Sequence, residues 1–168
     1  LGQLIQQART KPWFNNTIFV VVADHCASSA GKWEINIDKH HIPAIFYNLN
    51  QPHQTIDRLT SQIDLLPTLF GYLNWNYDTE LYGKDINKTK EGDERAFIGN
   101  YRTLGMLKGK VFTQIDDRKR VVQFDVIDRK GTMNVSSNKD KKLTDQTISY
   151  YQTASERFKN GKMKEQSE

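Results

Sequence analysis

Apolar residues follow a helical spacing at the start of the chain and then a strand-like run. Residues 1–10 carry apolar side chains on one helical face, and Pro12 ends the pattern. Residues 17–23 are apolar without interruption and rich in β-branched side chains. Such a run is typical of a strand covered on both faces, as in a parallel sheet. The N-terminal part therefore predicts a helix followed by a buried strand.

The remaining pattern predicts one more strand of the core, one more helix and a β-rich C-terminal part. Residues 41–49 form the second strand, and Pro43 suits its start because a ladder donor can be spared there. A helix over residues 64–73 can be capped by Ser61 or Asp64, with Pro67 in its first turn. The other expected elements are strands over 96–101, 106–115 and 120–127, a hairpin bend at Gly109 and Lys110, and a closing helix over 140–157.

These elements predict an α/β fold with a mostly parallel core sheet flanked by helices. A smaller C-terminal antiparallel β element and the closing helix complete it. The length of 168 residues fits one domain of common size, and no repeat or linker divides the chain. The longest apolar run, residues 18–23, is far shorter than the ~20 residues that span a bilayer. Because the first helix begins midway at Leu1, we expect the chain to be part of a longer protein.

The net charge of +4 does not indicate a nucleic-acid binder. Residues 1–128 carry as many acidic as basic side chains, and the whole excess lies after Asp128. A binder of nucleic acid usually has a basic stripe on its folded face. The basic residues here gather between Arg129 and Lys142 and near the C-terminus, which is typical of a solvated turn and tail. We therefore expect no nucleic-acid partner.

The pair Asp24-His25 is the first candidate for chemistry, because it directly follows the predicted buried strand. Ligands of parallel α/β sheets bind beyond the carboxyl ends of the strands. A carboxylate oxygen and an imidazole nitrogen suit Zn²⁺ or Mn²⁺ and supply two ligands of a site that needs four or more. Cys26 is the only cysteine, so no internal disulfide or cysteine-rich metal site is possible. On spacing alone, Asp24 as a turn cap and His25 as an ordinary polar residue remain the simpler interpretation.

His41 begins the second predicted strand and is the second candidate. If the two strands are neighbours, His41 lies close to Asp24-His25, as a ligand or as a donor to an anionic substrate oxygen. A solvated loop histidine is the alternative for His41, and it is the preferred interpretation for His40 and His53.

The loop after His25 offers weaker candidates. Lys32 and Lys39 flank it and can attract an anionic substrate, although surface lysines are usually only solvated. Ser28 and Ser29 lack the Gly-x-Ser-x-Gly surroundings of a nucleophile elbow, so a serine nucleophile there is disfavoured.

Several motifs in a fixed order resemble the C-terminal part of sulfatase-like enzymes of the alkaline phosphatase superfamily. Within that family the chain looks most like the lipoteichoic acid synthase and phosphoglycerol transferase branch. The similarity extends over residues 1–160. The motifs are Ala23-Asp24-His25, His41-Ile42-Pro43, Ser61-Gln62-Ile63-Asp64-Leu65-Leu66-Pro67-Thr68-Leu69, Leu81-Tyr82-Gly83-Lys84-Asp85, Phe97-Ile98-Gly99-Asn100-Tyr101-Arg102-Thr103-Leu104-Gly105 and Tyr150-Tyr151-Gln152-Thr153-Ala154.

The resemblance implies that Asp24 and His25 bind the catalytic metal, Mn²⁺ or Zn²⁺. A histidine ligand makes Ca²⁺ less suitable. The other ligands, including a Thr, Ser or modified Cys nucleophile, belong to the family's N-terminal half and lie outside this chain. His41 matches a histidine that stabilises the anionic group or the leaving group in some branches, and Asp64 is a structural cap. Residues 1–160 would form the C-terminal portion of an incomplete alkaline phosphatase-like catalytic domain, and residues 161–168 a disordered polar tail.

The implied reaction transfers phosphoglycerol-type groups, or hydrolyses related esters, through a covalent intermediate at the bacterial cell surface. The implied partners are an anionic phospho- or sulfo-ester substrate and the N-terminal half of the same catalytic domain. Membrane association would come only through N-terminal helices of the parent protein, with this domain on its extracytoplasmic, periplasmic or cell-surface face. The chain alone is then expected to be inactive.

Two other functions remain open on the sequence. The first is sulfate ester hydrolysis by a true sulfatase, which shares the same metal pair. The second is a non-catalytic binding module that keeps the fold as a scaffold, and the intact Asp24-His25 pair argues mildly against it.

Overall fold

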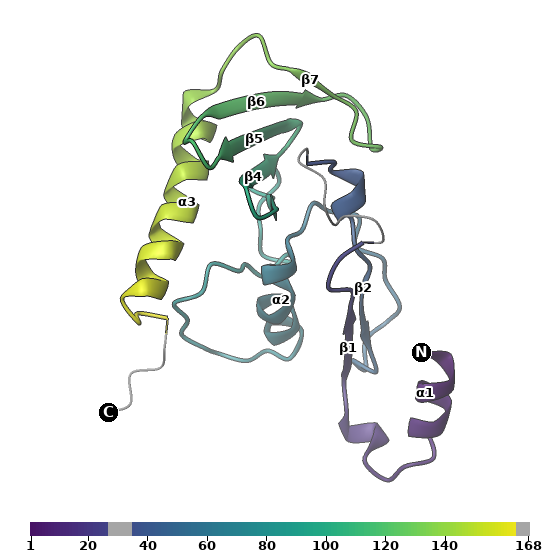
Figure 1. Cartoon of the computed structure of the whole chain (residues 1–168). Coiled ribbons are helices and arrows are strands. Elements are labelled where there is room, and N and C mark those ends of the chain that lie inside the picture. The colour runs from purple at the N-terminus through teal and green to yellow at the C-terminus, as the bar shows by residue number, and fades with distance from the viewer. Residues whose placement is uncertain (27–34, 164–168) are drawn as a thin grey trace.

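The computed structural model describes residues 1–26 and 35–163. Figure 1 shows α1 and the β1–β2 ribbon on one side of the molecule and α3 on the other, with α2 between them. The helices are α1 (Gly2–Ala8), α2 (Leu65–Tyr72) and α3 (Lys141–Lys159), and the short 3₁₀ turns are η1 (Phe14–Asn16), η2 (Asp38–His40) and η3 (Gln62–Asp64). The strands are β1 (Phe19–Val22), β2 (Ala44–Tyr47), β3 (Ala96–Gly99), β4 (Thr103–Lys108), β5 (Val111–Asp116), β6 (Val121–Val126) and β7 (Met133–Val135).

The elements agree with the sequence prediction in type and place. Each predicted helix or strand segment contains an element of that type, and the hairpin bend falls between Lys108 and Val111 as expected. The short strand β7 was not predicted, because three residues with a polar Asn134 at their centre carry no clear alternation. Gly161 to Met163 form a turn, and residues 164–168 of the predicted tail lie outside the described residues.

The prediction of a mostly parallel core sheet was wrong for the strands that the structure describes. β1 and β2 pair antiparallel, with Val22 opposite Ala44, and the pairs from β3 to β7 are antiparallel too. The last residue of β1 lies beside the first residue of β2, so the connection joins the two strands at one end. A parallel pair needs a crossover that returns the chain to the opposite end. An apolar run thus indicates that both faces of a strand are buried. It does not determine whether the adjacent strand pairs parallel or antiparallel.

The C-terminal half forms the predicted antiparallel β element with its closing helix. Its strand order is β3-β4-β5-β6-β7, and α3 packs against β4 and β5. The Tyr151 hydroxyl of α3 donates to the carbonyl of Gly105 at 2.7 Å. A Cβ atom on Gly105 would lie 2.3 Å from the ring of Phe112, which is fully buried, so the close approach requires glycine. The fold class is therefore α/β, with this sheet as a separate layer.

A buried ion pair joins this sheet to the rest of the molecule. The carboxylate of Asp64, 3% exposed, accepts two hydrogen bonds from the guanidinium of Arg95 at 2.7 and 2.9 Å. It also accepts from the backbone N–H groups of Ser61 and Lys84 at 2.9 and 2.8 Å. Ser61 and Asp64 form a capping box around η3, which confirms the predicted cap. The pair holds η3 and the start of α2 against β3.

Within residues 1–26 and 35–163, no helix is long and apolar enough to cross a membrane.

Candidate functional site

The Asp24-His25 pair lies where β1 ends, as the sequence predicts. The N–H of Ala23 donates to the carbonyl of Pro43 at 3.3 Å, which is the last backbone contact between the two strand segments. Beyond it the chain leaves the ribbon, and both side chains reach solvent, with exposed fractions of 88% for Asp24 and 70% for His25. The end of the strand thus presents a carboxylate and an imidazole next to each other.

Local hydrogen bonds fix how these two side chains meet. One oxygen of Asp24, Oδ1, accepts the backbone N–H of His25 at 2.9 Å, and the other, Oδ2, lies 3.5 Å from Nε2 of His25. Nδ1 of His25 lies 3.0 Å from the carbonyl oxygen of Cys26. Because a carbonyl only accepts, this contact assigns the proton of the neutral ring to Nδ1 and leaves the lone pair on Nε2. Two electron-rich atoms, Oδ2 and Nε2, therefore lie within 3.5 Å of each other.

This donor set fits a divalent metal ion. A carboxylate oxygen and an imidazole nitrogen are ligands of Zn²⁺ and Mn²⁺, and a second hydrogen bond that orients the ring is a common feature of histidine ligands. Across residues 1–26 and 35–163, no group of three or more His, Cys, Asp or Glu side chains is placed to hold a metal. The described part of the chain thus offers two ligands.

His41 comes near this pair through its backbone. Its carbonyl oxygen accepts a hydrogen bond from Sγ of Cys26 at 2.8 Å, so the segment entering β2 lies beside the residue after His25. The His41 residue is exposed, and its role toward a substrate anion stays a prediction. His40 is half-buried with Nδ1 2.7 Å from the carbonyl oxygen of Asn36, which agrees with an ordinary loop histidine.

The weaker candidates add little to the site. Lys39 donates its backbone N–H to the side-chain oxygen of Asn36 at 3.1 Å, as part of the turn before β2. Lys32, Ser28 and Ser29 lie outside the described residues.

Gln62 touches the site and was not singled out by the sequence analysis. Its Nε2 donates to the carbonyl oxygen of Ala23 at 3.1 Å, one residue before Asp24. The two residues are 39 positions apart, and a glutamine after a helix cap carries no signal for such a contact.

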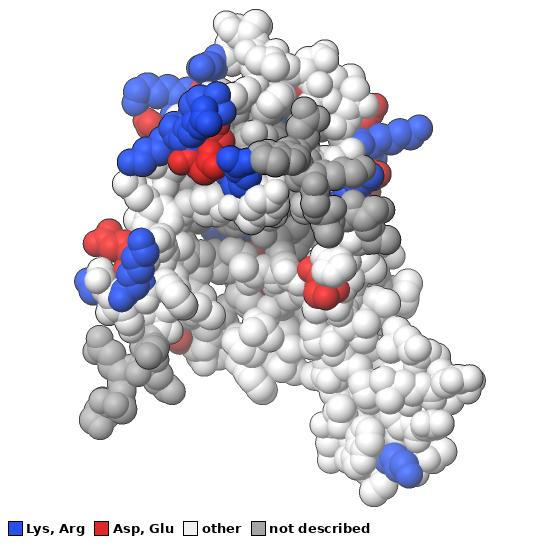
Figure 2. Space-filling view, viewed as in Figure 1, with Lys and Arg blue, Asp and Glu red and all other residues white. Residues whose placement is uncertain are grey.

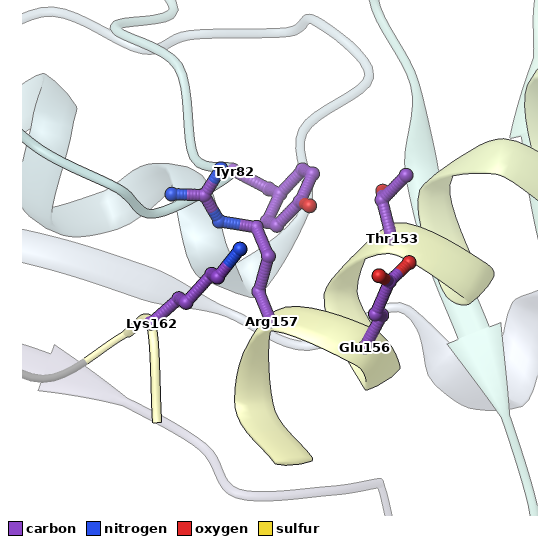
Figure 3. A pocket seen from close by; sticks show the side chains of 5 residues that line it. All are labelled: Tyr82, Thr153, Glu156, Arg157 and Lys162. Atoms are coloured by element: carbon purple, nitrogen blue, oxygen red, sulfur yellow. The ribbon is translucent and has the colours of Figure 1, made fainter. Parts of the chain in front are cut away.

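A hollow of about 400 Å³ lies away from this pair, beside the C-terminal end of α3. Figure 3 shows its lining side chains, which are Tyr82, Thr153, Glu156, Arg157 and Lys162. Arg157 forms an ion pair with Glu80, so the basic and acidic side chains around the hollow balance. None of the sequence-predicted site residues lines it.

Charge is unevenly spread over the surface. On the face drawn in Figure 2, Lys and Arg gather over the upper part, near the start of α3, whereas the part over α1, β1 and β2 is almost free of charged side chains. Apolar residues are exposed on both faces of the ribbon, with exposed fractions of 39% for Val20, 37% for Val22 and 48% for Ile45. The strand that carries the metal-type pair is thus apolar and partly uncovered.

Comparison with known proteins places these features in a wider context. A family model described as Sulfatase matches residues 1–75, the segment that holds Asp24, His25 and His41. A solved structure of a protein in the alkaline phosphatase superfamily from Vibrio parahaemolyticus matches 98% of this chain with a TM-score of 0.89 and 24% sequence identity. The match covers 40% of that protein, so this chain spans about two fifths of its length. The chain therefore has the fold of part of an alkaline phosphatase superfamily protein.

Proposed function

We propose that this chain is the C-terminal part of a sulfatase-like, metal-dependent enzyme, and that Asp24 and His25 supply its share of the metal site. The observation that carries the proposal is the proximity of Asp24 Oδ2 and His25 Nε2, 3.5 Å apart, at the end of β1. The pair lies inside the segment that matches the Sulfatase family model. The alkaline phosphatase superfamily fold of the whole chain supports the same assignment.

A divalent metal bound here would polarise a phosphoryl or sulfuryl oxygen and favour the ionised form of a hydroxyl nucleophile. Asp24 and His25 would hold it, and the carbonyl of Cys26 keeps the His25 ring turned with Nε2 toward Asp24. His41, exposed at the entry to β2, would donate to an anionic oxygen of the substrate or of the leaving group. We favour Mn²⁺ or Zn²⁺ over Ca²⁺ because of the imidazole ligand.

The remaining ligands and the nucleophile would come from the N-terminal half of the same catalytic domain. The exposed side chains of Val20, Val22 and Ile45 support such a partner, since exposed apolar residues that lie together often mark an interface. The matched structure, of which this chain spans 40%, leaves room for that half. On this view residues 1–168 alone are inactive.

The finer assignment is transfer of phosphoglycerol-type groups through a covalent intermediate on the outer face of a bacterial membrane. It rests on the order of sequence motifs that resemble the lipoteichoic acid synthase and phosphoglycerol transferase branch. In this assignment the parent protein is anchored by its own N-terminal helices, and the substrate is an anionic phospho-ester. Hydrolysis of a sulfate ester is the second candidate, favoured by the family description over residues 1–75.

The test is turnover by the complete protein that contains this chain. We expect diacylglycerol release from phosphatidylglycerol vesicles, lost after treatment with a chelator and restored by Mn²⁺ or Zn²⁺. Asp24→Ala should lower the rate by at least about a hundredfold, because it removes a metal ligand. His53→Ala changes an exposed histidine outside the site and should leave the rate unchanged.

Other outcomes separate the candidates. Turnover of 4-nitrophenyl sulfate without release of diacylglycerol would assign sulfate ester hydrolysis instead. Turnover that survives in Asp24→Ala, or the absence of turnover on both esters, would contradict the proposed enzyme.

A further inference from the structure

The carbonyl of Ala23 is held by a side chain from a distant part of the chain. Nε2 of Gln62 donates to this oxygen at 3.1 Å, while the N–H of Ala23 donates to the carbonyl of Pro43. Three residues further on, Sγ of Cys26 donates to the carbonyl of His41. Residues 23–26 are therefore fixed at three points. Gln62 supplies a contact that comes from outside the segment entering β2.

Gln62 belongs to a turn that several hydrogen bonds hold in place. It is the first residue of η3, whose N-terminal end is closed by the capping box of Ser61 and Asp64. The Asp64 carboxylate is in turn clamped by both terminal nitrogens of Arg95 and by the N–H of Lys84. Each of these carboxylate contacts is 2.9 Å or shorter. The backbone of Gln62 is therefore held in place, and its side chain extends from there to the end of β1.

The contact itself adds little to folding stability. It is exposed to solvent. The net gain from one such hydrogen bond is similar in size to the side-chain entropy lost when a glutamine is fixed. Its effect is therefore on geometry. The carbonyl of Ala23 belongs to the same peptide plane as the N–H of Asp24, so fixing that oxygen fixes the direction in which the chain enters Asp24 and His25.

We propose that Gln62 is a positioning residue for the metal pair, an inference that rests on the proposed function of Asp24 and His25. By holding the Ala23 carbonyl it keeps Asp24 Oδ2 and His25 Nε2 close to each other. Removing the partners that orient metal ligands typically lowers metal affinity by about 10- to 100-fold. Because Gln62 acts through the backbone, we place its effect near the lower end of that range.

The experiment compares Gln62→Met with Gln54→Met in the complete protein that contains this chain, so that the whole metal site is present. Methionine keeps the length of glutamine and removes the donor without adding charge. Gln54 is the matched control, because its Nε2 donates to the hydroxyl of Tyr72 and it is also exposed. Zn²⁺ affinity is measured by titration of the His25 ring resonances, ligand geometry by the visible absorption of bound Co²⁺, and stability by the thermal midpoint without metal.

We expect Gln62→Met to weaken Zn²⁺ binding by about tenfold and to change the Co²⁺ spectrum. Its thermal midpoint should shift no more than that of Gln54→Met, which should bind metal like the unchanged protein.

Each other result decides the question. Equal Zn²⁺ affinity and equal Co²⁺ spectra for Gln62→Met and the unchanged protein, with binding lost in Asp24→Ala, overturn the role of Gln62 and leave the proposed function intact. A much larger fall in thermal midpoint for Gln62→Met than for Gln54→Met makes Gln62 a folding residue and also overturns it. Metal binding by the unchanged protein no tighter than by Asp24→Ala rejects the proposed function, and the role of Gln62 with it.

Discussion

His25 is oriented by its immediate neighbours in sequence. The carbonyl of Cys26 lies 3.0 Å from Nδ1, and Asp24 Oδ1 accepts the His25 N–H, so the ring and the carboxylate are set by three consecutive residues. A sequence can encode these hydrogen bonds locally, whereas the direction in which the chain enters Asp24 also depends on the distant contact from Gln62. Both side chains remain exposed to solvent and are accessible to a ligand.

The pKa of Tyr151, in contrast, is set by residues that are distant in sequence and bury its hydroxyl. Burial raises the pKa of the Tyr151 hydroxyl from 10.0 to about 12. Since the folded-state pKa lies above that of the unfolded chain, the neutral hydroxyl contributes stability below about pH 10. That contribution is lost as the pH rises through about 12. We expect absorbance at 295 nm to show one tyrosine that ionises near pH 12 and is missing in Tyr151→Phe.

An ionisation step near pH 10 that disappears in Tyr151→Phe would contradict a buried hydroxyl. Loss of the hydrogen bond to Gly105 should also cost about 1 kcal/mol of folding free energy in that variant.

Among single residues, the position of Asp24 and His25 at the end of β1 is confirmed, and their role as metal ligands stays a prediction. Asp24 and His25 were predictable, because polar ligand-type residues directly follow a buried apolar run. Gln62 was not, because its contact depends on where a turn 39 residues later lies in space. The prediction that His41 comes close to Asp24-His25 is matched only by its backbone, through Cys26.

Among the elements, the junction between η3 and β3 is held by charge inside the protein. The side chains of Asp64 and Arg95 are 4% and 3% exposed, and the guanidinium also lies 5.2 Å from the centre of the Phe97 ring. A buried pair of this kind stabilises little compared with an apolar replacement, but the loss of one partner leaves an uncompensated charge.

Arg95→Met should therefore lower the free energy of unfolding by about 3–5 kcal/mol. Arg129→Met is the matched control, because Arg129 pairs with Asp57 on the surface, where both side chains are largely exposed. An exposed pair contributes only about 0–1 kcal/mol. Urea unfolding measures both variants, and equal losses would show that the Asp64–Arg95 pair is not the junction proposed here.

The elements also mark where sequence patterns stop being informative. The capping box at Ser61 and Asp64 was predictable, since cap chemistry is local. The direction of β2 relative to β1 was not, because burial on both faces is compatible with either direction. The pairing of Val22 with Ala44 depends on the path of the connecting chain, and the pattern of apolar residues does not predict that path.

For the whole molecule, apolar and charged residues are unevenly distributed over the surface. The buried core of Ile98, Leu107 and Phe112 in the C-terminal sheet also includes Ile35, from the segment before η2. The β1–β2 ribbon, which carries the metal-type pair, exposes apolar side chains on both faces. The overall similarity to part of an alkaline phosphatase superfamily structure fits this asymmetry. The exposed apolar ribbon agrees with the proposal that another part of the same domain covers it.

The most direct test of the metal pair is Mn²⁺ titration of the chain, followed by paramagnetic broadening of its four histidine rings. We expect that His25 broadens first, that His53 and His40 broaden last, and that Asp24→Ala removes the preference for His25. Uniform broadening of all four rings, or the same preference in Asp24→Ala, would contradict a metal site at the end of β1.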